Sequence, residues 1–118
     1  MLITKTTRGD VAILSLAGRL DFHARHDFQA EIQKTKESVA HLVILNMKEV
    51  TFIDSVALGL ITVAYKTLEG ANVRLVIADA HSYVQKILTL TNLESIIKMY
   101  PSNEEAMASR IPATSPSN

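Results

Sequence analysis

The sequence predicts an α/β domain in which helices pack against a single-layer mixed, partly parallel β-sheet. Strand-like apolar runs alternate with segments of helical period, after an initial pair of strands. Two of these runs, LVIL at 42–45 and VRLVI at 73–77, are short and nearly continuous, which is typical of strands covered on both faces. Because parallel strands need crossover connections, we expect the intervening helices to form right-handed crossovers.

The first two strands are expected to form a hairpin. Residues 2–6 and 11–17 are strand-like, and the turn signal Thr7-Arg8-Gly9-Asp10 lies between them. The second segment, VAILSLA, is apolar on both faces, as a central strand should be. Gly18 is expected to end this strand.

A helix is expected from about residue 23 to residue 38. Its apolar positions recur at helical spacing, and charged residues fill the positions between them. The expected core stripe consists of Ala24, Phe28, Ile32 and Thr35.

A second helix is expected after the strand at 42–45. Asp54 or Ser55 would be its N-cap, because a short side-chain oxygen can accept hydrogen bonds from the free N–H groups of the first turn. Gly70 is expected to stop this helix in the left-handed conformation.

The remaining elements continue the alternation. They are a strand at 73–77, a helix at 82–91 with an apolar stripe, a short strand at 96–99, and a helix at 103–110 capped by Ser102 or Asn103. We expect residues 1–110 to form one domain. The tail 111–118, IPATSPSN, is expected to be disordered because prolines and serines dominate it.

The second helix carries two apolar stripes instead of one. The first consists of Leu58, Ile61, Tyr65 and Leu68, and the second of Val56, Leu60, Val63 and Thr67. One stripe can face the sheet, and the other is either buried by a neighbouring helix or exposed as a partner-binding surface. The helix start also presents free N–H donors and a partial positive charge, which favour an anion such as a phosphate on a nearby hydroxyl.

Composition narrows the function classes. The chain has 118 residues, of which 47% are hydrophobic and 20% charged, as expected for one globular domain. The formal net charge of +0 gives no overall attraction to nucleic acid or to an anionic membrane. Cysteine is absent, which excludes thiol chemistry.

The sequence shows no signal for export or membrane insertion. The first residues lack the apolar segment of a signal peptide, and the longest apolar run, Val56 to Tyr65, is about half as long as a membrane-spanning helix. We therefore expect a cytoplasmic protein without membrane insertion.

At this point the residues resemble a known family. The order of two strands, GRLD, a helix, LVILNMKEVTFIDSVALGLI, a helix and VRLVIADA is similar to the STAS domain, the fold of bacterial anti-sigma-factor antagonists. The resemblance runs from about residue 2 to residue 110. Its most specific parts are Gly18-Arg19-Leu20-Asp21, the segment from Leu42 to Asp54, and the turn from Asp54 to Gly59.

The resemblance implies a regulatory switch and not an enzyme. Such antagonists carry Asp-Ser-Ser-Gly at the start of the second helix, and the second serine is phosphorylated by a partner that is both an anti-sigma factor and a kinase of the histidine-kinase ATPase type. The unphosphorylated form binds that partner and releases the sigma factor. A phosphate adds a charge of about −1.5 to −2, which would oppose docking through an apolar contact.

This sequence departs from the family pattern at the acceptor position. Asp54 and Ser55 match the first two places, but Val56 stands where the phosphoacceptor serine should be, and Ala57 replaces the glycine. Three interpretations follow: constitutive binding of the partner, Ser55 as a substitute acceptor, or a scaffold that serves another partner. Constitutive or differently regulated binding is favoured over Ser55 phosphorylation, because a serine that caps the helix turns its oxygen towards its own backbone.

Two carboxylates complete the expected site. Asp21 and Asp54 follow strands expected to be parallel neighbours, so both should lie at one end of the sheet, where ligands of open α/β folds tend to bind. They could do acid–base work, but capping of the following helices is the preferred role. The expected partner-binding residues are Asp21, Asp54, Ser55, Val56, Ala57, Gly59 and Leu60.

Other groups of polar residues give only weak indications of a functional site. His23, His26 and Asp27 lie within one helical turn but offer no third ligand at a sensible spacing, so no metal is expected. Ser55 with His81 lacks the G-x-S-x-G motif of a nucleophile, and no nucleotide-binding glycine loop is present, so neither catalytic residues nor cofactors are expected. The densest basic patch, Lys34–Lys36, is followed by Glu37, which does not indicate nucleic-acid binding.

The favoured function is therefore a non-enzymatic STAS-type regulator whose partner is an anti-sigma factor with a histidine-kinase-type ATPase domain. The alternatives are a small-ligand or nucleotide-binding STAS module, and a structural subunit of a sensory or transport complex. A homodimer also stays open.

Overall fold

The computed structural model describes residues 1–110, so the tail expected to be disordered, 111–118, lies outside the described residues. Its five strands form one sheet in the order β1-β2-β3-β4-β5, in which β1 is antiparallel to β2 and all other neighbours are parallel. The strands are β1 (Leu2–Arg8), β2 (Val11–Leu20), β3 (Leu42–Ile53), β4 (Arg74–Ala78) and β5 (Met99–Tyr100). The predicted mixed, partly parallel sheet is confirmed.

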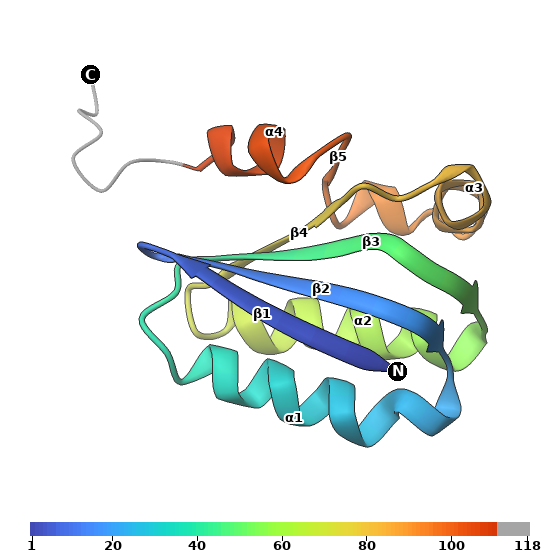
Figure 1. Ribbon diagram of the computed structural model, residues 1–118, viewed down its shortest axis with the longest axis horizontal. Coiled ribbons are helices and arrows are strands. Elements are labelled where there is room, and N and C mark those ends of the chain that lie inside the picture. The colour runs from blue at the N-terminus through green and yellow to red at the C-terminus, as the bar shows by residue number, and fades with distance from the viewer. Residues whose placement is uncertain (111–118) are drawn as a thin grey trace.

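Helices lie on both sides of this sheet (Figure 1). The helices are α1 (Arg25–Lys36), α2 (Ser55–Glu69), α3 (Ser82–Leu90) and α4 (Asn103–Ala108), with short 3₁₀ turns η1 (Phe22–Ala24) and η2 (Leu93–Ser95). Helices α1 and α2 run side by side beneath the sheet, both starting at the end where β2 and β3 finish. Helix α4 packs on the other face, and α3 contacts β3 near its carboxyl end.

The main core lies between the sheet and the pair α1 and α2. The predicted stripe of α1 is buried there, and its largest member, Phe28, is 1% exposed. Burying a side chain of this size stabilises the fold by about 1.5–3 kcal/mol. A smaller cluster under α4 contains Val11, Ile13, Leu42, Ile44, Val76, Ala78 and Ala106. Both faces of the central strands are therefore covered, which explains their nearly continuous apolar runs.

Two strands are longer than the sequence predicts. Strand β2 continues through Gly18 to Leu20, because Gly18 adopts a φ of +101° and register shifts on either side of it absorb the irregularity. Strand β3 continues to Ile53, since Val50 and Ile53 are buried in the main core and pair with β2. The predictions that Gly18 ends a strand and that the strand at 42–45 is short are wrong.

The end of α2 also differs from the prediction. Gly70 has φ −62° and ψ −18°, which is right-handed, so it is not the left-handed stop. The chain reverses at Asn72, whose φ is +62°, and the amide of Val73 donates to the carbonyl of Leu68 at 2.8 Å. Asparagine tolerates this conformation better than most residues, because its short polar side chain can bond locally.

The carboxyl-terminal part is mostly as expected, with a shifted last strand. Ser102 caps α4 by accepting a hydrogen bond from the amide of Glu105 at 3.2 Å. The strand expected at 96–99 is instead Met99–Tyr100, because the turn η2 precedes it and Ile97 is 1% exposed in the main core.

A buried amide joins α4 to the sheet. The Nδ2 of Asn46, a residue that is 8% exposed, donates to Asp79 Oδ2 at 3.1 Å and to Asn103 Oδ1 at 2.8 Å. Asp79 has a left-handed φ of +58° where the chain leaves β4. This network could not be predicted from local patterns, since its three members lie far apart along the chain.

Candidate functional site

Two aspartates mark the edge of the sheet where β2 and β3 end. Leu20 pairs with Ile53 in the last rung of the two strands, so Asp21 and Asp54 leave the sheet side by side. Asp54 Oδ1 accepts a hydrogen bond from the amide of Ala57 at 2.9 Å and caps α2. Asp21 Oδ1 accepts from the amide of His23 at 3.0 Å and caps η1. The preferred capping role of both carboxylates is confirmed.

Asp21 is also paired with a cation. The Nε of Arg19 donates to Asp21 Oδ2 at 3.3 Å. Partial burial raises the pKa of Asp21, but the hydrogen bonds from Arg19 and from the His23 amide, with the positive charges of both residues, outweigh it and lower the pKa overall. The ionised carboxylate therefore contributes stability at pH values above its ordinary pKa, and this contribution is lost as the pH falls through the lowered pKa.

The first turn of α2 exposes two residues in succession. Asp54 is the N-cap, so Ser55 is the first helical residue and its side chain is not committed to capping, which removes the capping argument against it. Val56 follows and is 37% exposed, whereas valines of a core are normally covered. An apolar side chain is thus left partly exposed beside the positive end of a helix.

Two of the expected partner-binding residues are not on the surface. Ala57 is 0% exposed and Leu60 is 8% exposed. Ala57 turns towards the sheet with Ile61 and Ala64, and Leu60 packs beside Phe28 of α1. The expectation that these two side chains form a contact surface is therefore wrong for this structure, and both instead hold α2 in place.

Gly59 is an exposed glycine in the interior of α2. A Cβ atom built on it would meet no heavy atom within 4 Å, so neither packing nor backbone conformation within the chain demands glycine there. Glycine in a helix interior costs about 1 kcal/mol relative to alanine. This cost has no internal compensation in the described part of the chain.

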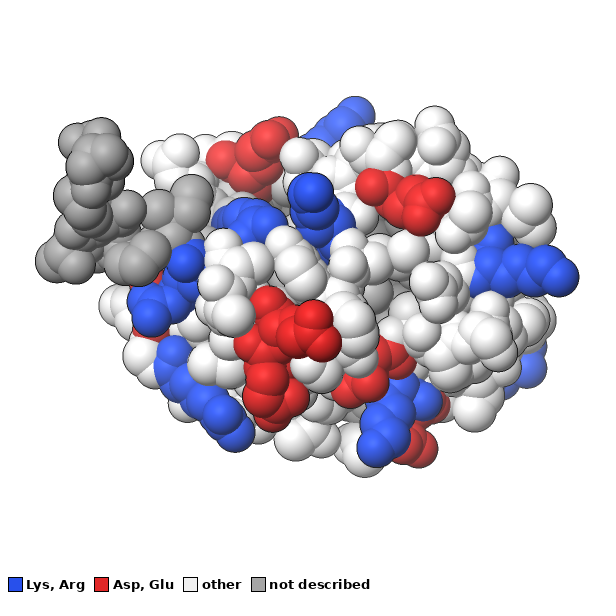
Figure 2. Space-filling view, turned by 90° about the horizontal axis from the view of Figure 1, so that it is seen from above, with Lys and Arg blue, Asp and Glu red and all other residues white. Residues whose placement is uncertain are grey.

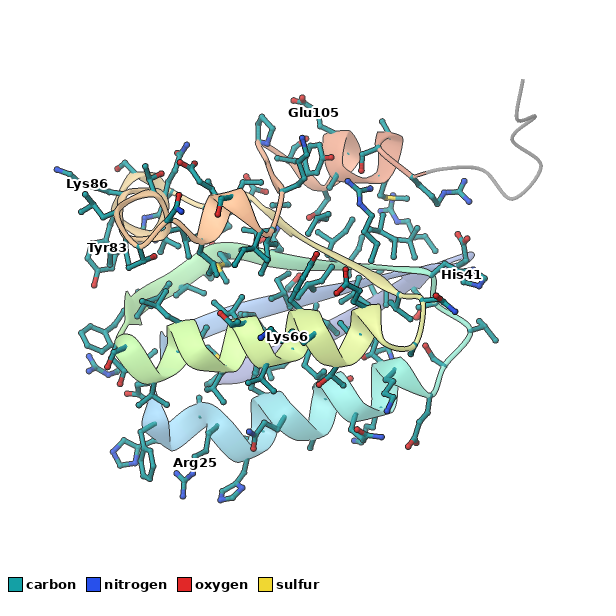
Figure 3. All side chains as sticks on the ribbon, turned by 180° about the vertical axis from the view of Figure 1, so that it is seen from behind. Arg25, His41, Lys66, Tyr83, Lys86 and Glu105 are labelled. Atoms are coloured by element: carbon teal, nitrogen blue, oxygen red, sulfur yellow. The ribbon has the colours of Figure 1, made fainter. Side chains whose placement is uncertain are left out.

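Two arginine–aromatic stacks lie at the same edge. The guanidinium of Arg25 lies 3.6 Å from the ring centre of Phe22, and that of Arg19 lies 3.9 Å from the ring centre of Phe52. Phe22 is 48% exposed. Figure 3 shows Arg25 at the end of the molecule where α2 starts, and His41 at the opposite end. Sequence reasoning missed both stacks. The short spacing between Phe22 and Arg25, just after the capping Asp21, could have indicated the first, whereas Arg19 and Phe52 lie on different strands.

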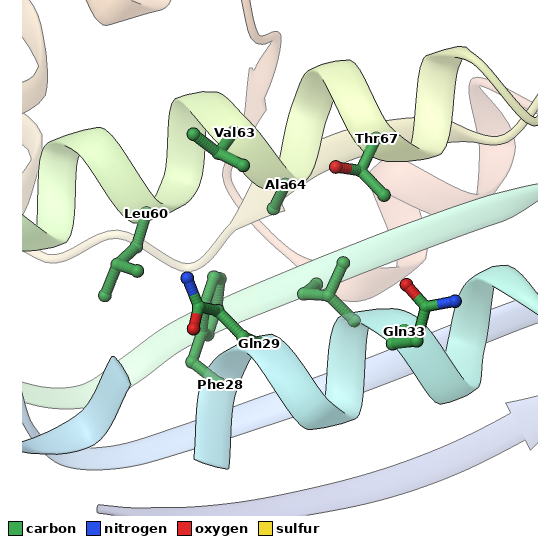
Figure 4. A pocket seen from close by; sticks show the side chains of 8 residues that line it. Phe28, Gln29, Gln33, Leu60, Val63, Ala64 and Thr67 are labelled. Carbon is green, nitrogen blue, oxygen red and sulfur yellow. The ribbon is translucent and has the colours of Figure 1, made fainter. Parts of the chain in front are cut away.

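A groove between α1 and α2 is lined by three members of the second predicted stripe, Leu60, Val63 and Thr67 (Figure 4). The groove has a volume of about 200 Å³ and is lined by Phe28, Gln29, Ile32, Gln33, Leu60, Val63, Ala64 and Thr67. Val63 is 56% exposed. All four members of the first predicted stripe pack against the main core, Ile61 and Leu68 fully buried and Leu58 and Tyr65 partly buried. The helix is rotated so that its small residues, Ala57 and Ala64, face the sheet.

The structure gives little support for a metal site, for a Ser55–His81 pair, for a basic surface patch or for a membrane-spanning helix. Among residues 1–110, no group of three His, Cys, Asp or Glu side chains could hold a metal ion, and this includes the segment with His23, His26 and Asp27. The Nε2 of His81 lies 2.6 Å from the carbonyl oxygen of Val50, so this imidazole is engaged away from Ser55. Figure 2 shows basic and acidic side chains interspersed on the face viewed from above. Within the described residues, every helix is too short or too polar to cross a bilayer.

The STAS domain model matches residues 3–106 of the chain. The chain belongs to the STAS domain family. A STAS-domain containing protein of Pseudomonas aeruginosa is 28% identical over 77% of this chain and 89% of its own length. The anti-sigma F factor antagonist of Paenibacillus polymyxa is 26% identical over 82% of this chain and 84% of its own length. The crystal structure of a candidate anti-sigma factor antagonist from Thermotoga maritima has a TM-score of 0.82 and 26% identity, covering 90% of this STAS domain and 92% of that chain.

Replacement of Gly59 by alanine should stabilise this STAS domain. We expect Gly59→Ala to raise the free energy of unfolding by about 0.5–1 kcal/mol in urea titrations, because alanine is the better helix former and the site has room for a Cβ. The matched control is Gly18→Ala, which should destabilise the domain because Gly18 has a positive φ. A loss of stability in Gly59→Ala would show that the helix needs this glycine for its own packing.

Proposed function

We propose that this STAS domain is a non-enzymatic signalling protein that acts as an anti-sigma-factor antagonist. It binds an anti-sigma factor with a histidine-kinase-type ATPase domain through the edge where β2 and β3 end. This docking surface consists of the exposed residues Phe22, Ser55, Val56 and Gly59 and the partly exposed Arg25. The names of its relatives support the class of partner, and the exposure of Val56 at the first turn of α2 carries the proposal.

The docking surface combines the features that protein interfaces favour. Its apolar centre is Val56, and the ring of Phe22 is half exposed beside the guanidinium of Arg25. Aromatic and arginine side chains are enriched among the residues that contribute most to binding. Gly59 lies one turn further along α2 and allows a partner's backbone to approach closely. Contact with a partner thus accounts for a glycine at position 59, although glycine lowers the stability of the helix there.

The absence of a hydroxyl at position 56 changes the regulation. In the related antagonists, a phosphate at the second serine opposes docking, since it brings a charge of about −1.5 to −2 into an apolar contact. Val56 cannot receive a phosphate, so this STAS domain binds its partner irrespective of the partner's kinase activity. Ser55 is accessible and does not cap the helix, so it stays the alternative acceptor against which constitutive binding is tested below.

The alternative of a small-ligand site at this edge is less well supported. The groove next to the docking surface has a volume of about 200 Å³, and pockets that enclose small molecules usually hold about 300–1,000 Å³. The two carboxylates at the edge are occupied as helix caps. A flat protein contact fits this surface better than an enclosed ligand.

Replacement of Val56 by aspartate should weaken binding. We expect Val56→Asp to reduce the affinity for a histidine-kinase-type anti-sigma factor at least about tenfold, because the charge must be desolvated in the contact. The wild-type and variant proteins are used as bait in extracts of the native cells, and the retained ATPase is identified by mass spectrometry and then titrated in purified form.

The matched control is Val39→Asp. Val39 is 78% exposed and lies between α1 and β3, at the opposite end of the molecule. This variant should bind like the wild type, and both variants should melt within a few degrees of it. Equal affinity of folded Val56→Asp and wild-type protein would contradict the proposal, as would the absence of any histidine-kinase-type ATPase among the proteins that the wild type retains.

Restoring the hydroxyl should restore phosphorylation. With the purified partner and ATP, the mass of the wild-type protein should stay unchanged, whereas Val56→Ser should gain one phosphate, measured as intact mass. The control combines Val56→Ser with Ser55→Ala, which should still gain one phosphate. Stoichiometric phosphorylation of the wild type that disappears in Ser55→Ala would instead make Ser55 the acceptor and overturn constitutive binding.

A further inference from the structure

We propose that the free edge of β1 binds the same edge of a second copy of this chain, so that the two sheets become one across a two-fold axis. The pairing is antiparallel, and Thr4 of one copy lies opposite Thr4 of the other. This inference goes beyond the proposed function, because the surface runs along the side of the sheet and not across the end where β2 and β3 finish.

Strand β1 offers a complete row of main-chain groups to another strand. It pairs with β2 along all seven of its residues, and within residues 1–110 no strand pairs with its other side. In Figure 1 it forms the near edge of the sheet, with α1 beneath it. Six of the seven residues are exposed, and Leu2 is 66% exposed. An exposed edge of this length is a template for pairing with another chain.

The hairpin turn fixes which main-chain groups of β1 point outwards. Arg8 and Val11 flank the two-residue turn Gly9-Asp10, and such a turn is closed by a hydrogen bond between its flanking residues. Because bonding alternates along an antiparallel pair, the even-numbered residues of β1 bond to β2. The odd-numbered residues direct their amide and carbonyl groups to the free edge; they are Ile3, Lys5 and Thr7.

Charge selects the register of the two copies. Pairing centred on Lys5 would place two ammonium groups opposite each other, which is unfavourable, and pairing centred nearer either end would leave more residues unpaired. Pairing centred on Thr4 places Lys5 opposite Ile3. Both residues direct their main-chain groups to the free edge, so each such pair exchanges two hydrogen bonds. The Nζ of Lys5 lies 3.9 Å from Glu31 Oε2 of α1, so its charge is already compensated and does not oppose pairing at the edge.

The helix beneath β1 is self-complementary in charge about the same axis. A hollow of about 230 Å³ lies between β1 and α1, and its α1 side consists of residues three or four positions apart: Asp27, Ala30, Glu31 and Lys34. An antiparallel arrangement of α1 and its copy brings Asp27 opposite Lys34, with the small Ala30 between the two ion pairs. Within residues 1–110, neither Asp27 nor Lys34 belongs to an ion pair.

Strand and helix agree on where the axis passes. Helix α1 starts at the end where β2 finishes, and β1 is antiparallel to β2, so α1 and β1 run in the same direction. Ile3 borders the hollow together with Asp27, and Lys5 pairs with Glu31. The level of Thr4 therefore falls near the middle of the charged face of α1. Both elements fit a second copy of the chain, and the charge pattern identifies that copy as the partner of this edge.

The mass of the wild-type protein in solution is the first test. Sedimentation equilibrium should show twice the mass of the chain at concentrations above about 10 μM, with dissociation on dilution. A protein that stays monomeric at about 1 mM would overturn the inference. The measurement uses no anti-sigma factor, so its outcome is independent of the proposed function.

Lys5→Pro tests the pairing of the edges. Proline removes an amide hydrogen that points away from β2, so it should block the second copy and preserve the hairpin. We expect the Kd of the dimer to rise at least about tenfold. The matched control is Lys5→Ala, which removes the same charge but keeps the amide, and its Kd should stay within about threefold of the wild-type value. Thermal melting checks each fold, and equal dimerisation of folded Lys5→Pro and Lys5→Ala would contradict edge pairing.

A charge exchange on α1 tests the two-fold arrangement without altering the strand. Lys34→Asp should raise the Kd of the dimer about tenfold, because it brings two carboxylates together across the axis. Combining it with Asp27→Lys should restore the dimer, since opposite charges then meet again. If folded Lys34→Asp dimerises like the wild type, or if the folded double variant does not recover, the dimer uses another surface and the inference is wrong.

Discussion

The parallel pairing of β2 with β3 is the constraint on which the rest of the structure depends. The register in which Leu20 lies opposite Ile53 ends both strands at the same level. The two following aspartates, Asp21 and Asp54, therefore start η1 and α2 beside one another, and α1 and α2 lie parallel under the sheet. Without this register neither the proposed docking surface nor the groove between the helices would exist.

The same edge separates structural residues from residues available to a partner. Asp21 and Asp54 use their oxygens to cap helices, and Ala57 faces the core. Val56 and Gly59 have no comparable role within the described chain, since one exposes apolar surface and the other lowers helix stability. Residues that lower the stability of the fold and make no compensating contact within it are those expected to contact a partner.

The sequence predicted the alternation of strands and helices and the edge with its two caps, because those depend on local patterns. It could not predict that β2 continues through Gly18, since the bulge exists only when β3 is paired beside it. Nor could the sequence predict which face of α2 is turned towards the sheet, because this depends on the contact that Leu60 makes with α1. The stack of Arg25 on Phe22 needs side-chain positions that periodicity does not give.

Hydrogen exchange of the STAS domain, alone and with the proposed anti-sigma factor, tests the proposed docking surface most directly. The first amides of a helix have no acceptor within it, so those of Ser55 and Val56 should exchange quickly in the free protein. On binding, exchange at these amides should slow markedly, whereas amides near His41, at the opposite end, should keep their rates. Slowed exchange near His41 with no change at Ser55 and Val56 would contradict the account.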